Sequence, residues 1–208
     1  MTQEWINSEE LQKKLYHPYF EEEDKFLKQE LKRGNLIDLG CGGGRISRQL
    51  QGLYTHYTGI DIDQEVVDKH NKNTPHNVSY QHGNVCNLDL ENRSFDNALC
   101  MTTYANFGEK LDLMLQETSR ILKPKGIFIG SCYHEGALHK RLQLYGAFGD
   151  IIKSINDEGH VTFKEGMETD ISCQYTQNQI EEHLFQAGFD VDRMEKSGPF
   201  YLFKGIKK

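Results

Sequence analysis

From residue 34 onward, short apolar runs alternate with stretches in which apolar residues recur at helical spacing. The clearest helical stripe runs from Leu111 to Leu122 and is followed by Pro124, and weaker stripes occupy residues 45–51 and 64–71. Buried strands are predicted by five apolar runs, at residues 36–39, 57–60, 78–80, 95–101 and 127–129. Strands that alternate with helices predict an α/β fold, in which helices cover both faces of a parallel sheet.

The two ends of the chain depart from this alternation. Residues 8–33 are highly charged, and their apolar positions predict one or two amphipathic helices. Near the other end, Thr176 and Gln179 fit a capping box, and the apolar runs at residues 189–194 and 200–206 predict an antiparallel hairpin. About 40 residues separate the fifth strand from the capped helix, and an excursion this long inside a compact domain is usually functional.

Composition narrows the classes of function. The 208 residues include 24 Lys and Arg against 31 Asp and Glu, which gives a net charge of −7. This balance argues against a nucleic-acid partner, because affinity for phosphates comes from clustered Lys and Arg. No apolar run approaches the roughly 18 residues that span a bilayer, and the N-terminus lacks a signal-peptide pattern. The five cysteines form no C-x-x-C pair, so we expect buried thiols and no metal site. Together these features lead us to expect a cytoplasmic location and no membrane partner.

Glycines are concentrated after the first predicted strand, where Gly40, Gly42 and Gly44 form a G-x-G-x-G loop. Such a loop lets the backbone approach a ligand without any Cβ in the way. The dinucleotide-binding pattern would need a glycine where Arg45 stands. Asp61 ends the second strand about 20 residues after Gly40, the separation that brings a carboxylate to the hydroxyls of a bound ribose. We therefore expect a ligand with a ribose at the carboxyl ends of the strands.

Several segments resemble the motifs of class I S-adenosylmethionine-dependent methyltransferases. The similarity covers most of residues 34–130, with a weaker one at residues 176–206. The segments are Leu36-Ile37-Asp38-Leu39-Gly40-Cys41-Gly42-Gly43-Gly44, Gly59-Ile60-Asp61-Ile62-Asp63, Ser94-Phe95-Asp96-Asn97-Ala98-Leu99, Arg120-Ile121-Leu122-Lys123-Pro124-Lys125-Gly126 and Phe185-Gln186-Ala187-Gly188-Phe189. The resemblance implies a Rossmann-like, mostly parallel sheet of seven strands with the last strand antiparallel, and S-adenosylmethionine as the cofactor.

The resemblance also implies which residues hold the cofactor. Asp61 would hold the ribose hydroxyls, Asp38 would lie near the methionine amine, and Met101 would lie against the adenine or the sulfonium. Asn84 stands where many members have an aspartate; its amide oxygen can still accept from the adenine amine, and the Val85 N–H can still donate to the ring. The implied cofactor-binding residues are Asp38, Gly40, Gly42, Asp61, Ile62, Asn84, Val85 and Met101.

Methyl transfer from a sulfonium mainly requires that the acceptor atom be aligned with the methyl carbon. An amine only has to arrive unprotonated, whereas an alcohol or phenol needs a base. The catalytic candidates are Tyr104, Tyr133 and His134, each weighed against a plain packing role. We place His134 first, because it follows the fifth strand directly and histidine titrates near neutrality. Tyr16 and His17 join them if the N-terminal helix folds over the site.

We expect a single domain with four parts. Residues 1–33 form a helical lid, residues 34–132 the cofactor-binding core, residues 133–175 a substrate-side excursion, and residues 176–208 a helix and hairpin that complete the core. Residues 1–20 and 133–175 would close over the acceptor. Aromatic side chains in the excursion suit a flat or cationic acceptor, or form the excursion's own core. They are Tyr133, His139, Tyr145, Phe148, His160, Phe163 and Tyr175.

The leading hypothesis is methyl transfer to a nitrogen or oxygen of a small molecule, by a monomer or homodimer. A second hypothesis is methylation of an RNA base, because residues 103–107 faintly resemble cap guanine methyltransferases; the net charge of −7 speaks against it. A third is a different reaction of the same cofactor, such as a cyclisation or a lyase reaction. A fourth is a cofactor-binding subunit that activates another chain.

Overall fold

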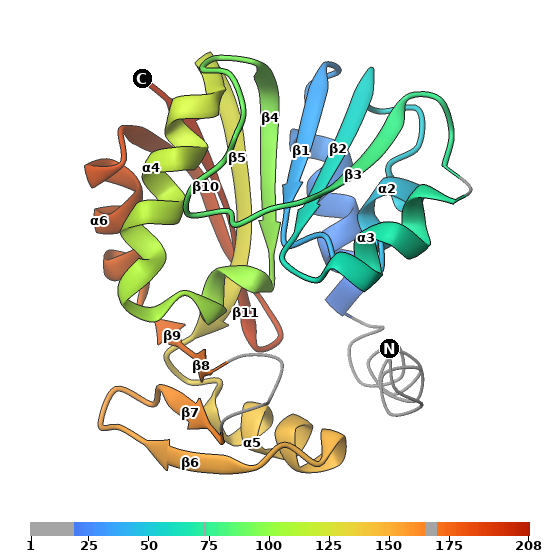
Figure 1. Cartoon of the computed structure of the whole chain (residues 1–208). Helices are drawn as coiled ribbons and strands as arrows, with labels where there is room; N and C mark the ends of the chain where they lie inside the picture. Colours follow the sequence, from blue (N-terminus) through green and yellow to red (C-terminus); the bar gives the residue numbers. More distant parts are fainter. Residues whose placement is uncertain (1–18, 73, 165–169) are drawn as a thin grey trace.

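A computed structural model describes residues 19–72, 74–164 and 170–208 of the chain. Seven strands form one sheet in the order β10-β11-β5-β4-β1-β2-β3, and the short strand β9 pairs with the far end of β5 (Figure 1). The strands are β1 (Asn35–Leu39), β2 (His56–Asp61), β3 (Val78–His82), β4 (Phe95–Met101), β5 (Leu122–His134), β9 (Gln174–Tyr175), β10 (Phe189–Ser197) and β11 (Phe200–Lys207).

The predicted fold class is confirmed. Strands β3, β2, β1, β4 and β5 pair in parallel along the sheet, whereas β11 is antiparallel to both β5 and β10. The hairpin predicted around Gly198-Pro199 is formed by β10 and β11. The last strand is therefore the antiparallel one, in an otherwise parallel Rossmann-like sheet.

Helices cover both faces of the sheet. They comprise residues 19–30, α2 (Arg45–Gln49), α3 (Gln64–Asn71), α4 (Leu111–Ile121) and α6 (Gln177–Gln186). Successive strand residues point to opposite faces, so Ile37 packs in a cluster with α4 and α6, while its neighbour Leu36 packs with residues 19–30, α2 and α3. Within the described ranges, no helix combines the length and apolar character needed to cross a membrane.

The predicted helix boundaries rest on observed caps. Asp63 precedes α3, and its Oδ1 accepts hydrogen bonds from the N–H groups of Glu65 and Val66 at 2.8 and 3.3 Å. Thr176 and Gln179 form the predicted capping box at the start of α6. Both helices therefore begin where the sequence pattern indicates.

The junction of α4 and β5 differs from the expectation that the helix ends before Pro124 and that the next strand begins at residue 127. Helix α4 ends at Ile121 and β5 begins at the next residue, so Pro124 lies within the strand. The pairing with β4 jumps from Phe95–Leu122 to Asn97–Ile127, so residues 123–126 leave the ladder. A proline is tolerated in that interruption because its missing N–H has no ladder partner to serve.

Between β5 and α6 the chain forms α5 (Leu138–Phe148), β6 (Ile152–Ile155), β7 (Val161–Phe163) and β8 (Ile171–Ser172). Strands β6, β7 and β8 form a separate antiparallel sheet, which lies with α5 beyond the carboxyl end of β5, at the bottom of Figure 1. Tyr145 and Phe163 pack edge to face at 4.9 Å between ring centroids, in a small core of their own. Tyr175 instead joins the main core, and the side chain of Phe148 is not described.

Two further expectations concern the chain termini and the cysteines. Residues 1–18, with Tyr16 and His17, lie outside the described residues, so the first half of the expected lid is not placed. All five cysteines are free thiols, and four of them are buried. Burial raises the pKa of each thiol, as the sequence pattern of buried cysteines predicts.

Candidate functional site

The strand order reverses between β1 and β4, at the centre of the sheet. Strands β2 and β3 continue on one side of this point, and β5, β11 and β10 on the other (Figure 1). We call the carboxyl ends of β1 and β4 at this reversal the crevice, because this is the usual place for a ligand in an open α/β sheet. The glycine loop follows β1, and the loop into a short 3₁₀ helix, η1 (Thr103–Asn106), follows β4.

The glycine loop has two positions that only glycine suits. Gly40 has φ +76°, and a Cβ there would lie 2.5 Å from Cγ2 of Thr103, which reaches over from the loop after β4. Gly42 has φ +44°, and a Cβ there would meet nothing within 4 Å. The first glycine therefore lets the two loops approach each other, whereas the second borders open space at the crevice.

Asp61 ends β2 and its carboxylate is held against this loop. Its Oδ2 accepts the N–H of Gly42 at 2.8 Å, and its Oδ1 accepts the N–H of Asp63 at 3.0 Å. Ile62, the next residue, is 72% exposed, the largest exposure among the large apolar side chains of the described residues. A fixed carboxylate and an uncovered apolar surface thus lie beside each other at the carboxyl end of β2.

Asp38 lies beneath the loop, near the end of β1, and is only 2% exposed. Burial raises the pKa of its carboxyl group to about 6, although a 2.6 Å hydrogen bond from the hydroxyl of Tyr57 and the charge of Arg45 oppose this rise. Asp38 is therefore a buried carboxyl group that changes charge close to physiological pH.

Arg45 connects the loop to the N-terminal helix, and the sequence pattern did not indicate this. Its guanidinium group pairs with the buried carboxylate of Glu23, bonds Gln49 at 2.8 Å and lies 4.2 Å from the ring centroid of Phe20. Glu23 and Phe20 both belong to the helix at residues 19–30. The only local signal was that Arg45 stands where a third glycine is missing, which says nothing about a partner 22 residues earlier.

The remaining cofactor candidates lie around the same strand ends. Asn84 is exposed after β3, and its amide oxygen accepts the N–H of Cys86 at 2.9 Å. Val85 is buried in the core beside it. Met101 ends β4 and is buried on the sheet face that carries residues 19–30 and α2. Each of these residues therefore follows or ends a strand at the carboxyl edge of the sheet.

Of the three candidate bases, Tyr104 does not face the crevice. Its side chain is fully buried, packs edge to face against Tyr175 and Phe203, and its hydroxyl has no hydrogen-bond partner among the described residues. Burial raises the pKa of this phenol well above its ordinary value. Tyr104 thus serves as a core residue, which corrects its place among the bases.

The structure also speaks against His134 as the first candidate. Its Nδ1 accepts the N–H of Gly136 at 2.9 Å, so the ring proton resides on Nε2, which donates to the carbonyl of Gly198 at 3.1 Å. Both ring nitrogens therefore join β5 to the β10–β11 turn, and neither has a lone pair directed at a substrate. Tyr133, the third candidate, is 7% exposed and stacks on Phe200 with 4.8 Å between ring centroids.

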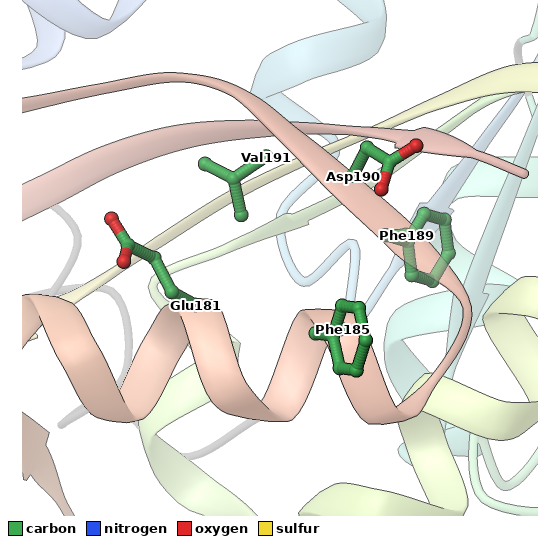
Figure 2. A pocket seen from close by; sticks show the side chains of 5 residues that line it. All are labelled: Glu181, Phe185, Phe189, Asp190 and Val191. Atoms are coloured by element: carbon green, nitrogen blue, oxygen red, sulfur yellow. The ribbon is translucent and has the colours of Figure 1, made fainter.

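Two surface hollows lie away from the crevice. A hollow of about 400 Å³ lies between α6 and the start of β10; Figure 2 shows its lining residues Glu181, Phe185, Phe189, Asp190 and Val191. A second, of about 290 Å³, is lined by Glu135, Asp157, Glu158, Gln174, Thr176 and Gln179. Among the residues that the structure describes, no three His, Cys, Asp or Glu side chains gather closely enough to hold a metal ion.

Comparison with known proteins identifies a class of protein that has this fold and this strand-end site. The model of the methyltransferase domain family matches residues 37–130. Residues 37–130 form a domain of the class I S-adenosylmethionine-dependent methyltransferases, whose cofactor is S-adenosylmethionine. The fold and cofactor implied by the sequence motifs are therefore confirmed.

Individual relatives are more distant. The chain is 30% identical over 129 residues to the ubiquinone biosynthesis O-methyltransferase of Colwellia psychrerythraea, which covers 60% of this chain and 52% of that protein. The chain thus spans about half the length of the curated relatives it matches.

Two solved structures share the fold over nearly the whole chain. One belongs to the complex between the Haloferax volcanii Trm112 methyltransferase activator and a methyltransferase, with TM-score 0.72, 17% identity, and coverage of 96% of this chain and 93% of that one. The other is a methyltransferase of Thermotoga maritima described as a possible histamine N-methyltransferase, with TM-score 0.71, 21% identity, and coverage of 98% and 96%.

Proposed function

We propose that this protein transfers the methyl group of S-adenosylmethionine to a nitrogen or oxygen atom of a small-molecule acceptor. The observation that carries the proposal is the carboxylate of Asp61, which accepts the N–H of Gly42 in the loop after β1, one of the two strands between which the strand order reverses. A carboxylate fixed there has lone pairs left for both hydroxyls of a ribose.

The residues at the crevice fit the cofactor. The open space at Gly42 allows a ligand to lie against the loop backbone at Gly40 and Gly42. The exposed side chain of Ile62 offers an apolar surface for the adenine ring, next to the ribose position at Asp61. These observations support the binding of a nucleoside with a free diol.

Four further residues complete the proposed cofactor site. The amide oxygen of Asn84 retains a second lone pair beside its bond to Cys86, so it can accept from the adenine amine, with the N–H of Val85 as a donor to the ring. Asp38 supplies a negative charge for the methionine ammonium group. Met101, at the end of β4, supplies an apolar contact.

The bound cofactor supplies a methyl group on a positively charged sulfur, which is already a good leaving group. The chain's part is to bind the acceptor, align its reacting atom and keep water out. We assign cofactor binding to residues 34–132, structural completion of the core to residues 176–208, and acceptor binding to residues 133–175. Residues 19–33 cover the glycine loop through the contact of Arg45 with Glu23 and Phe20.

Relatives favour both kinds of acceptor atom. The Colwellia psychrerythraea relative is named an O-methyltransferase, and the Thermotoga maritima neighbour is described as a possible N-methyltransferase. Because the Haloferax volcanii neighbour was solved with an activator protein, a partner chain is a second candidate requirement for full activity. The net charge of −7 favours a small acceptor over RNA.

Calorimetric titration with S-adenosylhomocysteine tests the cofactor site. Asp61→Ala should weaken binding about 100-fold, because two hydrogen bonds to a charged group contribute about 1.5 kcal/mol each. Asp63→Asn is the matched control: it removes the neighbouring carboxylate but keeps a cap for α3, so binding should stay near the wild-type value. Wild-type affinity in Asp61→Ala would contradict the proposal.

Mass spectrometry of the cofactor after incubation with candidate acceptors tests the reaction. Methyl transfer leaves S-adenosylhomocysteine, whereas a cyclisation or a lyase reaction leaves other fragments. Recovery of intact S-adenosylmethionine from the isolated chain, but S-adenosylhomocysteine after addition of a partner protein, would point to the activator-dependent alternative.

A further inference from the structure

Arg141, in α5, is a fully buried guanidinium group with no carboxylate partner among the described residues. Its Nε donates to the hydroxyl of Tyr145 at 3.1 Å, and its Nη1 donates to the carbonyl of Gly159 at 2.8 Å and to Gln174 Oε1 at 2.9 Å. Its Nη2 donates to the carbonyl and the hydroxyl of Ser172. All five N–H donors are therefore used, and every acceptor is neutral.

A buried charge of this kind is costly to maintain. Hydrogen bonds to neutral groups satisfy the donors of a guanidinium group but leave its charge in place, and guanidinium does not lose its proton in proteins. The excursion consequently contains an uncompensated positive charge in a region of low dielectric, where a charge acts strongly on its neighbours. Within the described residues that charge forms no ion pair, because each of its hydrogen bonds goes to a neutral acceptor.

The charge of Arg141 lies next to Tyr133, the first residue of the segment to which we assign acceptor binding. The guanidinium carbon is 4.9 Å from the ring centroid of Tyr133, whose ring stacks on Phe200. Tyr19 and Phe20 pack against the same cluster, and Phe20 also lies under the guanidinium group of Arg45 at the start of α2. Tyr19, Phe20, Tyr133 and Phe200, which we call the aromatic cluster, thus extend from the excursion to the glycine loop.

Carboxylates close to the aromatic cluster are already engaged. Glu22 accepts the hydroxyl of Ser197, and Glu23 pairs with Arg45. Glu135 pairs with Lys196 at 3.0 Å. Among the described residues, none of these carboxylates forms an ion pair with Arg141.

The candidate bases supply a second, independent observation. Tyr104 is buried in the core, and both ring nitrogens of His134 are occupied. An acceptor that arrives as an anion needs neither of them, because its oxygen already has the electron pair that forms the new bond to carbon. The electron pair of the broken carbon–sulfur bond stays on sulfur, and no proton has to be removed.

We infer that Arg141 makes the site selective for aromatic acceptors that carry a negative charge, as an ionised phenol or a ring carboxylate, over cationic amines. The inference rests on the proposed function and deepens it. Arg141 is a positioning residue: its donors are saturated, so it acts through its charge and through the ring of Tyr133 and does not contact the reacting atoms.

Three probes that share one ring and differ in charge test the inference: 3,4-dihydroxybenzoate, 3,4-dihydroxybenzamide and 3,4-dihydroxybenzylamine. Their affinities are measured by calorimetry on the full chain saturated with S-adenosylhomocysteine. The benzoate should bind at least tenfold more tightly than the benzamide, and the benzylamine most weakly. Equal affinities, a preference for the amine, or no binding of any probe would overturn the inference.

Three variants test whether Arg141 causes the preference among the three probes. In Arg141→Met the preference for the benzoate over the benzylamine should fall to about onefold, whereas Arg141→Lys, which keeps the charge, should retain most of it. Tyr145→Phe removes one hydrogen bond to Arg141 without changing charge, so it should leave the preference unchanged. A preference in Arg141→Met equal to that of the wild type would refute the role of the charge.

The affinity for S-adenosylhomocysteine, measured in the same samples, separates the two proposals. No cofactor binding by the wild type would count against the proposed function itself. Cofactor binding without selection for the anion would count against the Arg141 inference alone. If circular dichroism shows that Arg141→Met does not fold, the affinities of the wild type and of Arg141→Lys for the three probes still test the inference.

Discussion

Folding and ligand binding favour different charge states of the Asp38 carboxyl group. Its carboxyl group is buried beside Tyr57, and burial raises the pKa to about 6. Because the folded state holds this proton more tightly than the unfolded chain, the resulting stability is complete below the unfolded pKa of 3.8 and is lost as pH rises through about 6. At neutral pH the cofactor-free protein therefore holds a buried carboxylate that awaits a cation.

We predict that Asp38→Asn makes the cofactor-free protein more stable above pH 6 and weakens its affinity for the cofactor. Asparagine retains an acceptor for Tyr57 but carries no charge, so the variant escapes a loss of up to about 3 kcal/mol that the raised pKa implies for the wild type. Thermal unfolding at pH 4 and pH 8 should show a smaller decline in the variant than in the wild type.

Titration with S-adenosylhomocysteine provides the other half of this test. Wild-type affinity should fall by about tenfold for each pH unit below about 6, because the protonated carboxyl no longer attracts the ammonium group. The Asp38→Asn variant should bind weakly and with a flat profile across the same range. Parallel profiles for the two proteins would contradict the assigned role of Asp38.

Gly40 and Gly42 should respond differently to the same substitution. Alanine at either position costs about 1–2 kcal/mol for the left-handed backbone. Gly40→Ala also drives a Cβ against Thr103, so it should lower the melting temperature further, whereas the Cβ in Gly42→Ala enters open space.

The expected pattern is a stability loss dominated by Gly40→Ala and a loss of cofactor affinity in Gly42→Ala of at least tenfold. Differential scanning calorimetry and titration with S-adenosylhomocysteine measure the two effects. Full cofactor affinity in Gly42→Ala would mean that the cofactor does not occupy the space at Gly42.

Individual residues were predictable where the partner is near in sequence. Thr176 and Gln179 form the capping box of α6 across three residues, and these residue types at this spacing predicted it. The contacts of His134 with Gly198 and of Arg141 with Gly159 and Ser172 join distant segments, and no local pattern encodes them. For that reason the sequence offered His134 as a base and overlooked Arg141.

At the level of elements, the edge of the sheet at β3 is closed by a side chain. The amide of Asn71, the last residue of α3, donates to the carbonyl of Tyr80 at 2.7 Å and accepts its N–H at 3.1 Å. The two bonds imitate the pairing of a neighbouring strand. An exposed strand edge invites pairing with another chain, and these two bonds oppose such pairing at Tyr80.

We predict that Asn71→Ala lowers the free energy of unfolding by about 2 kcal/mol, since two hydrogen bonds to a strand edge are lost. The freed edge should also promote self-association, which sedimentation velocity at increasing protein concentration measures. Asn77→Ala is the control, because its side chain makes one bond, to the carbonyl of Thr55, and does not cover the β3 edge. A variant of Asn71 that stays monomeric with wild-type stability would contradict the prediction.

The boundaries of the central strands and helices followed from hydrophobic periodicity, because each element buries one face or both faces against its neighbours. The start of β5 did not, because the polar segment at residues 123–126 interrupts the apolar pattern and leaves the ladder with β4, although it lies within the strand. The small strands β6, β7 and β8 were equally hidden, because segments of two to four residues are too short for a period to appear.

Taken as a whole molecule, the chain combines a core that the family motifs describe and an excursion that they do not. The core could be predicted because parallel strands bring their carboxyl ends, and hence the glycine loop and Asp61, to one edge. The excursion depends on Arg141, which bonds α5, β8, β9 and the turn at Gly159. Together with the small core around Tyr145 and Phe163, these contacts join distant segments and follow no repeating pattern.

The burial of the cysteines makes the protein convenient for site-directed labelling. Thiol reagents attack the thiolate, and the raised pKa values of the five native thiols keep that form scarce near pH 7. A single cysteine introduced on the exposed surface of α5, as in Gln143→Cys, would accordingly react first. A fluorophore attached there would report directly whether the excursion moves when the cofactor or an acceptor binds.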